Sequence, residues 1–290
     1  MNKITVNSRE LLNAINKSIC YSHDKEKKVL NSLNISVINN TVKLATTDGY
    51  YLSVIEVNGT LEQKQIDIDI KNVDSFNHNV IDFNIAISDK KELIKYLKDN
   101  KNCNIIFYTN NDNMIIFENN INTNKLILLN QDYTYVHYHR IIDNIVLKQD
   151  KFYYQNLSKD IIKQLKEVIE QFFKDNKEEL NLFKRSKKEQ DRLLEITFKL
   201  IFDYNSLKLE SIDSNDKIKT LYHTNNIDLS YTMSSQYISF NFNIILLNNI
   251  IKNLSDNQDY YIFFTHNLAA LYFISKDYKE TYLIMPIRQK

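Results

Sequence analysis

The sequence is poor in the residues on which several common kinds of site depend. Its 290 residues include two glycines, one proline, two cysteines and no tryptophan. Gly49 and Gly59 are the only positions where a positive φ angle carries no steric cost, which excludes a glycine-rich phosphate-binding loop. Cys20 and Cys103 are too few for a disulfide framework and lie in no metal-ligand spacing, which favours a reducing cytoplasm.

Strong charge and long apolar runs are lacking as well. The formal net charge is only +1, so no overall field indicates a nucleic-acid partner, and any such surface has to be local. No apolar run is long enough to span a bilayer, and the N-terminus lacks the apolar core of a signal peptide. We therefore expect a soluble cytoplasmic protein with no membrane partner.

What the sequence does contain is an internal repeat. Residues 83–100 align without gaps on residues 240–257, and the match continues from Phe107 to Phe264. The hydrophobic content of 43% is enough to bury a core in each half of the chain. The sequence therefore predicts two homologous domains, residues 1–145 and 146–290, with the join near residues 143–150.

Each half is predicted to run strand, helix and three strands, twice over. Residues 8–12 and 158–162 both predict a helix start, with Ser8 and Ser158 as N-caps. In the first half we expect strands at residues 3–6, 32–37, 41–46, 52–57, 82–87, 104–108, 114–118 and 126–129, and a second helix at residues 89–97. The fold class is α+β: duplicated βαβββ units with helices on one face of curved antiparallel sheets.

The second half departs from the repeat in one place. The segment at residues 165–193 is longer than its counterpart in the first half and is highly charged. This favours an extended helix or a helix-loop-helix insertion with a solvated face. A basic patch that touches DNA or a neighbouring subunit is the alternative.

Little in the sequence points to catalysis. His137 and His139 share one face of an expected strand, a spacing that could begin a metal site, but no Cys and no tight cluster of Asp, Glu or His lies nearby in sequence to complete it. There is no nucleophile elbow, no zinc-protease motif and no nuclease-like carboxylate pair. We expect a protein that is not an enzyme and holds no metal or cofactor; a metal-dependent enzyme using the two histidines is a remote alternative.

The single proline lies near the C-terminus, in the segment YLIMPIR at residues 282–288. Because proline cannot donate to a sheet ladder, we expect a strand that stops at Met285 and is followed by an exposed apolar ridge. The segment resembles the Val-Met-Pro-Met-Arg ending of the bacterial DNA sliding clamp, the DNA polymerase III β subunit family. A frayed edge strand is the alternative.

Two further segments resemble the same family, in the same order along the chain. Residues 30–33 and then 47–52 are similar to the Leu-Asn-Gly strand and the Thr-Asp-Gly-His-Arg-Leu turn of its middle domain. Residues 132–142 are similar to its Asp-Gly-x-Phe-Pro-Asp-Tyr-x-Arg-Val strand. The resemblance implies a polymerase processivity factor in which a groove between two domains receives a short linear motif of polymerases and of the clamp loader.

The resemblance also implies the residues of that groove. Tyr50, Tyr51 and Val136 replace the family's His, Arg and Pro, so we expect a more aromatic groove with an altered peptide preference. Carried over position by position, the groove residues are Lys27, Leu30, Thr47, Gly49, Tyr50, Tyr51, Leu52, Val136, Arg140, Ile141, Leu268, Leu283, Ile284, Met285, Pro286, Ile287 and Arg288. Aliphatic members such as Leu30, Leu52 and Ile284 could equally belong to the core.

In the family, helices line the inside of a ring and contact duplex DNA without reading its sequence. The corresponding DNA-facing candidates are Arg9, Lys17, Lys91, Lys95, Lys98, Lys159, Lys163 and Lys252. Family members with three domains per chain form a six-domain ring as dimers. If a chain with two domains keeps the six-domain ring, it has to close as a head-to-tail homotrimer. A non-ring adaptor or decoy that keeps only the peptide groove is the alternative.

Overall fold

The structure is a computed structural model, and it describes residues 3–18, 28–38, 40–62, 81–121, 124–133, 135, 138, 142, 153–177, 197–203, 206–213, 217–225, 238–264 and 270–287. The chain divides into two compact units, residues 1–137 and 138–290. Residues 143–150, where the sequence predicts the join between domains, lie outside the described residues.

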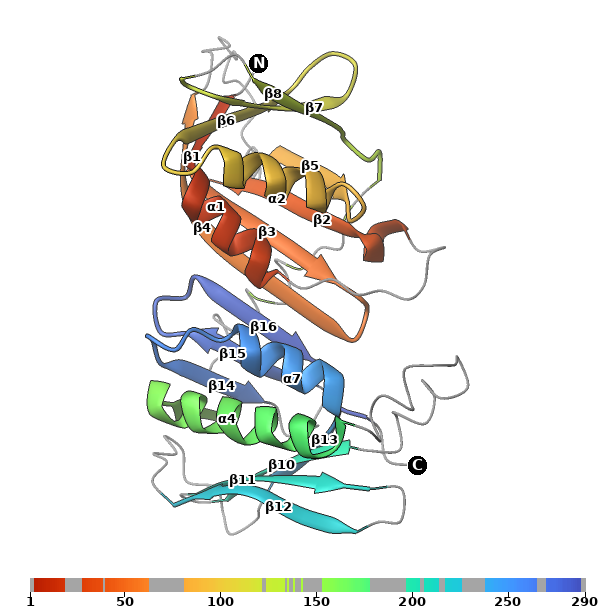
Figure 1. Cartoon of the computed structure of the whole chain (residues 1–290), viewed down its shortest axis with the longest axis vertical. Helices are drawn as coiled ribbons and strands as arrows, with labels where there is room; N and C mark the ends of the chain where they lie inside the picture. The colour runs from red at the N-terminus through yellow and green to blue at the C-terminus, as the bar shows by residue number, and fades with distance from the viewer. Residues whose placement is uncertain are drawn as a thin grey trace, which may run out of the picture. The chain divides into compact units, whose positions relative to one another are not determined.

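The described part of unit 1 contains two helices, a short 3₁₀ turn and strands that all pair antiparallel (Figure 1). The elements are β1 (Lys3–Asn7), α1 (Ser8–Lys17), η1 (Lys28–Asn31), β2 (Ser32–Ile38), β3 (Thr41–Thr47), β4 (Tyr51–Glu62), β5 (Ile81–Ala86), α2 (Lys90–Asp99), β6 (Asn104–Thr109), β7 (Met114–Asn119) and β8 (Lys125–Leu129). The described strands pair in the order β8-β7-β6-β1-β4-β3-β2-β5.

Unit 2 has the same succession of elements. They are β9 (Tyr153–Leu157), α4 (Lys159–Asp175), β10 (Thr197–Asp203), β11 (Ser206–Ile212), β12 (Ile218–Thr224), β13 (Ile238–Asn243), α7 (Ile244–Asn253), β14 (Tyr260–Phe264), β15 (Leu271–Ser275) and β16 (Glu280–Ile284). They form the sheets β16-β15-β14-β9 and β12-β11-β10-β13. Numbered within its own unit, each unit has the strand orders 8-7-6-1 and 4-3-2-5, so the predicted duplication of βαβββ units is confirmed.

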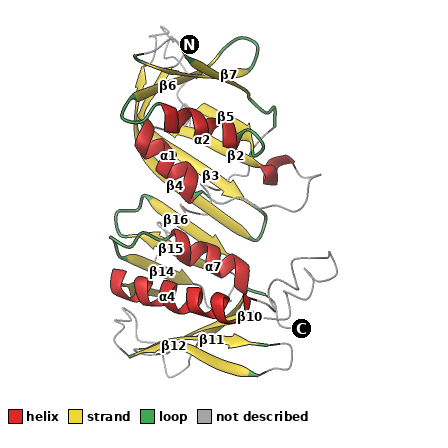
Figure 2. Ribbon diagram, in the orientation of Figure 1, coloured by secondary structure: helices red, strands yellow, loops and turns green. Residues whose placement is uncertain are grey.

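In each unit the described helices lie on one face of the strands (Figure 2). Their apolar residues recur at helical spacing and are buried, as at Leu11, Leu12 and Ile15 of α1. The cores also repeat. The rings of Phe83 and Phe107 meet edge to face with centroids 5.4 Å apart, and the corresponding rings of Phe240 and Phe264 do so at 5.6 Å.

The helix starts differ from the expectation at one position. Asn7, not Ser8, caps α1: its Oδ1 accepts hydrogen bonds from the backbone N–H groups of Arg9 and Glu10. Both residue types suit an N-cap, and the chain already turns at the asparagine. Ser158 caps α4 as predicted, accepting from Ile161 N.

The charged segment of the second half begins as an extended helix. Its first part belongs to α4, which has 17 residues where α1 has 10. Residues 178–193 of the expected insertion lie outside the described residues.

An asparagine joins the two ends of the strand order in unit 1. The N–H of Asn84 on β5 donates to Asn130 Oδ1 at 2.8 Å, and its carbonyl accepts from Gln131 N at 2.8 Å. Its side-chain amide donates to Tyr133 O at 2.9 Å and accepts from Asn34 at 3.0 Å. The segment that follows β8 is therefore held against β5, as buried polar groups require.

Unit 2 buries an amide where unit 1 buries a hydrocarbon. Gln155 of β9 pairs with Ile262 of β14 as Val6 of β1 pairs with the equivalent Ile105 of β6, and both side chains are buried. Among the residues that the structure describes, neither the nitrogen nor the oxygen of the Gln155 amide has a hydrogen-bond partner. Such a group costs about 1–3 kcal/mol of stability.

We predict that Gln155→Leu raises the free energy of unfolding by about 1 kcal/mol, because it removes this desolvated amide at similar volume. Urea unfolding followed by circular dichroism measures the change. The reciprocal control, Val6→Gln, should lower stability. A less stable Gln155→Leu protein would show that the amide is satisfied, for example by a buried water.

Candidate partner and nucleic-acid surfaces

The first cluster of predicted groove residues is a tight turn between β3 and β4 in unit 1. Asp48 Oδ1 accepts from the backbone N–H groups of Tyr50 and Tyr51, both at 2.8 Å. Thr47 Oγ1 donates to Tyr51 O at 2.6 Å and accepts from Gly49 N at 3.1 Å. Gly49 has a φ angle of 94°, which explains the glycine at this position. These bonds make the turn rigid.

Only part of this turn is available to a partner. The Tyr50 side chain is 67% exposed, whereas Thr47, Tyr51 and Leu52 are buried. Leu30, at the end of η1, is half-buried and packs beside Gly49: its Cδ1 lies 3.8 Å from where a Cβ on Gly49 would stand. The accessible residues, Leu30, Gly49 and Tyr50, are called the turn surface below.

The second cluster is the tail after β16 in unit 2. β16 ends at Ile284, one residue before the position expected from the proline. Leu283 and Ile284 are buried, and Met285 is 38% exposed. Pro286 and Ile287 are half-buried, and the N–H of Ile287 donates to Asn241 O at 2.7 Å. The residues Met285, Pro286 and Ile287 are called the tail surface below.

The internal repeat explains how the tail is held. Asn241 aligns with Asn84 in the repeat. In unit 1 the carbonyl of Asn84 accepts from Gln131 N, and in unit 2 the carbonyl of Asn241 accepts from Ile287 N. The segment after the last strand is thus fixed to the fifth strand in both units. The gapless repeat was the signal from which this anchor could have been found.

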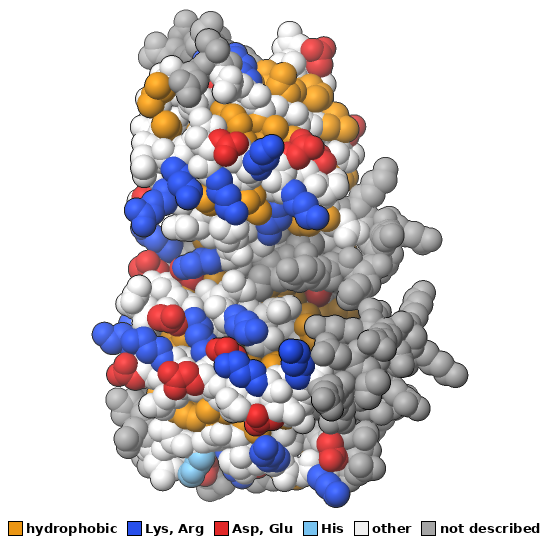
Figure 3. All heavy atoms as spheres, viewed as in Figure 1, with side chains coloured by type: hydrophobic (Ala, Val, Ile, Leu, Met, Phe, Trp, Pro, Cys, Tyr) orange, Lys and Arg blue, Asp and Glu red, His pale blue; other side chains and the backbone are white. Residues whose placement is uncertain are grey.

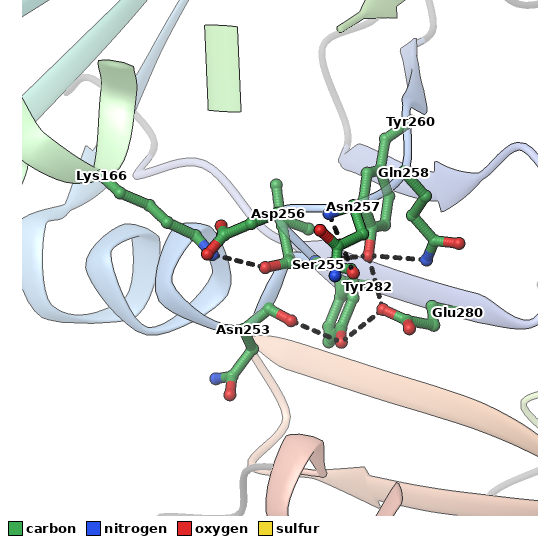
Figure 4. Close-up of polar contacts among 10 residues, drawn as sticks. Lys166, Asn253, Ser255, Asp256, Asn257, Gln258, Tyr260, Glu280 and Tyr282 are labelled. Atoms are coloured by element: carbon green, nitrogen blue, oxygen red, sulfur yellow. Dashed lines mark hydrogen bonds and ion pairs between the residues drawn. The ribbon is translucent and has the colours of Figure 1, made fainter. Parts of the chain in front are cut away.

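A buried polar cluster joins β16 to the end of α7 (Figure 4). Glu280 Oε2 accepts from the hydroxyl groups of Tyr260 at 2.5 Å and Tyr282 at 3.2 Å. The Tyr282 hydroxyl also lies 3.3 Å from Asn253 O, and the Tyr260 hydroxyl accepts from Ser255 N at 2.8 Å. Burial raises the pKa of Tyr260, and the Glu280 carboxylate raises it further, so this phenol remains a donor.

A lysine of α4 contacts the loop that follows α7. Lys166 on α4 donates to Leu254 O at 2.6 Å and to the Asp256 carboxylate at 2.5 Å (Figure 4). In unit 1, Lys90 on α2 similarly donates to Ser18 O, at the end of α1, at 2.6 Å. Neither lysine was among the predicted DNA-facing residues, and both ammonium groups are occupied by helix-terminal carbonyls.

The predicted DNA-facing residues lie on the helices as expected. Arg9 and Lys17 belong to α1, and Lys17 is half-buried; the exposed lysines Lys91, Lys95 and Lys98 belong to α2. The others, all exposed, are Lys159 and Lys163 on α4 and Lys252 on α7, whose ammonium lies 5.9 Å from the centre of the Phe173 ring. The helix face drawn in Figure 3 carries many of the blue Lys and Arg side chains.

Several predicted positions lie outside the described residues. They are the groove residues Lys27, Val136, Arg140, Ile141, Leu268 and Arg288, and the histidines His137 and His139. Within the part of the chain that the structure describes, no group of three or more His, Cys, Asp or Glu side chains could hold a metal ion. None of the described helices is long and apolar enough to cross a membrane.

No protein-family model and no curated protein sequence matches the chain. Solved structures do match. The DNA polymerase III beta subunit of Thermotoga maritima is 15% identical, with a TM-score of 0.70 over 100% of this chain and 66% of that chain. A DNA polymerase sliding clamp from Pseudomonas aeruginosa is 11% identical, with a TM-score of 0.70 over 99% of this chain and 67% of that one.

A third match is a putative DNA polymerase III beta subunit from Eubacterium rectale, 12% identical with a TM-score of 0.68 over 99% of this chain and 66% of that chain. The chain has the sliding-clamp fold. It spans about two thirds of the length of these clamps, and at this identity the likeness establishes the clamp fold rather than the activity.

One carboxylate supports the first helix of the clamp fold in unit 2. Asp259 Oδ1 accepts from Lys159 N at 2.9 Å, at the start of α4, and Oδ2 pairs with Lys276 at 3.0 Å. The backbone hydrogen bond from Lys159 and the contact with Lys276 lower the pKa of Asp259 below its usual value. A carboxylate at a helix N-terminus contributes up to about 1 kcal/mol.

We predict that Asp259→Ala lowers the free energy of unfolding by about 1 kcal/mol at neutral pH. A lowered folded-state pKa means that the carboxylate stabilises the protein above its unfolded pKa of about 4, and that this contribution is lost as pH falls through the lower folded pKa. The two proteins should therefore converge in stability below about pH 4. Urea unfolding from pH 7 to pH 3 tests this, and a gap that stays constant with pH would contradict it.

Proposed function

We propose that this protein is a DNA polymerase processivity factor that encircles duplex DNA as a ring and tethers a polymerase. The observation that carries the proposal is the clamp fold over the whole chain, with exposed lysines on the helix face. Basic helix surfaces suit phosphates without reading bases. Under this proposal the protein needs no catalytic group.

We further propose that the ring is a homotrimer closed head to tail. The fold supplies sheet edges suited to this: no described strand pairs with the outer edge of β8 or of β12. Both edges expose large apolar residues, Ile127 (54%) and Leu129 (50%) on β8 and Ile218 (59%) on β12. Unpaired edges with exposed apolar side chains are candidates for pairing with another chain, and two different edges give a heterologous contact that can close a ring.

If the ring forms, the protein in solution should have about three times the 34.5 kDa mass of one chain. After loading by a clamp loader, it should stay on circular duplex DNA far longer than on linear DNA with free ends, because only a free end lets a ring slide off. Size-exclusion chromatography with light scattering and a retention assay measure both. A monomer at micromolar concentration, or equal retention on both DNAs, would remove the ring.

We also propose that the turn surface and the tail surface both bind a short linear motif of the polymerase and of the clamp loader. Each surface is apolar, and each is held by hydrogen bonds that fix its backbone before a partner arrives. Preorganised apolar sites bind peptides with less loss of entropy. The buried predicted residues Thr47, Tyr51, Leu52, Leu283 and Ile284 then support these surfaces from beneath.

We predict that Tyr50→Ala and Met285→Ala each weaken binding of a clamp-binding peptide about tenfold, which corresponds to about 1.4 kcal/mol. Point variants are preferable to deleting the tail, because a deletion also removes the hydrogen bond from Ile287 to Asn241. Isothermal titration calorimetry measures the affinity.

The matched control is Tyr278→Asn, which removes a partly exposed tyrosine of unit 2 that belongs to neither surface. Tyr278 has a φ angle of 60°, a conformation that asparagine accepts. Unchanged peptide affinity in both surface variants, or an equal loss in the control, would refute the peptide site while leaving the ring proposal open.

A further inference from the structure

The helix pairs of the two units differ in charge. In unit 1, α2 carries four lysines against Glu92 and Asp99, and α1 carries Arg9 and Lys17 against Glu10. In unit 2, α4 carries four lysines against four acidic residues, and the one charged residue of α7 is Lys252. In Figure 3 blue side chains gather on the helix face of unit 1 with a few red ones beside them, and blue and red are interspersed over α4 and α7.

Lys91, Lys95 and Lys98 form a stripe on the exposed face of α2. Spacings of four and three residues place them on one face, opposite the buried Leu93 and Leu97. All three are exposed, and no ion pair of the described residues involves them. The stripe extends about 10 Å along the helix at 1.5 Å per residue, enough to meet more than one phosphate of a DNA strand.

The same spacing recurs on α4, but there its charge is compensated. Lys166, the third lysine of the series, pairs with Asp256 and caps the end of α7. No ion pair of the described residues involves Lys159 or Lys163, but the four lysines of α4 are balanced by four acidic residues, whereas the four lysines of α2 face only two. The remaining lysine, Lys174, pairs with Glu170 at 2.9 Å. A helix face whose lysines are balanced by as many carboxylates attracts an anion less than one with an excess of lysines.

We propose that contact with duplex DNA is concentrated in unit 1, on the stripe Lys91, Lys95 and Lys98, and that α4 presents a nearly neutral face to the DNA. The inference rests on the proposed function and says which of its helices binds. Uncompensated lysines release counterions from DNA when they meet phosphates; a face with equal numbers of both charges does not. Duplex DNA is the occupant because the stripe is cationic and holds no apolar anchor.

The test compares two triple variants of the full-length protein that lose the same charge. Lys91→Gln/Lys95→Gln/Lys98→Gln removes the stripe, and Lys159→Gln/Lys163→Gln/Lys174→Gln removes three exposed lysines of α4 without disturbing Lys166. Fluorescence anisotropy with a linear duplex at several salt concentrations gives the slope of log K against log salt. We expect the stripe variant to lose about three units of slope and the α4 variant less than about one.

A third variant, Asp160→Asn/Glu167→Gln/Glu170→Gln, provides a gain-of-binding arm. It uncovers the lysines of α4, so DNA affinity and salt slope should both rise above wild type. Circular dichroism confirms that each variant is folded. Provided that the wild type binds DNA, three results would overturn the inference: an equal loss of salt slope in the two lysine variants, a larger loss in the α4 variant, or no loss in either. A wild type without DNA affinity, free or loaded, would overturn the proposed function itself.

Discussion

The structure depends on the burial of one apolar stripe of each helix against the strands of its own unit. In unit 1 that burial gathers Leu11, Leu12 and Ile15 of α1 over a core built on Phe83 and Phe107. In unit 2 the corresponding pair is Phe240 and Phe264. Because an amphipathic helix can bury one face only, its other face must meet solvent. The charged surface of this protein is therefore a consequence of how its core forms.

The scarcity of glycine is accommodated by asparagine. Asn40, Asn102 and Asn113 adopt positive φ angles at turns, where a short polar side chain lowers the cost of the left-handed conformation. The two glycines serve needs that asparagine cannot meet. A Cβ on Gly59 would lie 2.7 Å from a methyl carbon of Val42, and Gly49 has a φ angle of 94° in a turn that packs beside Leu30.

Local patterns in the sequence predicted most of the fold. The expected strands and helices of the first half agree with the observed elements to within about two residues, since alternation and helical periodicity depend on near neighbours. The exception is β4, which extends to Glu62 where the sequence predicted an end at residue 57, because it also pairs with β1. The other errors were local. The N-cap of α1 falls on Asn7 because two adjacent residues can both cap, and β16 ends before Met285 because the tail turns to bond Asn241.

The sequence by itself determined the repeat, the element order and the lysines that stand on helix faces. Only the tertiary structure decided which of these groups remain available. Lys166 is occupied by a carbonyl 88 residues away and Lys90 by one 72 residues away, while Tyr50 is exposed and its neighbour Tyr51 is buried. The physical reason is that the availability of a side chain depends on the atoms packed around it. Those atoms come from distant parts of the chain, beyond the reach of any local pattern.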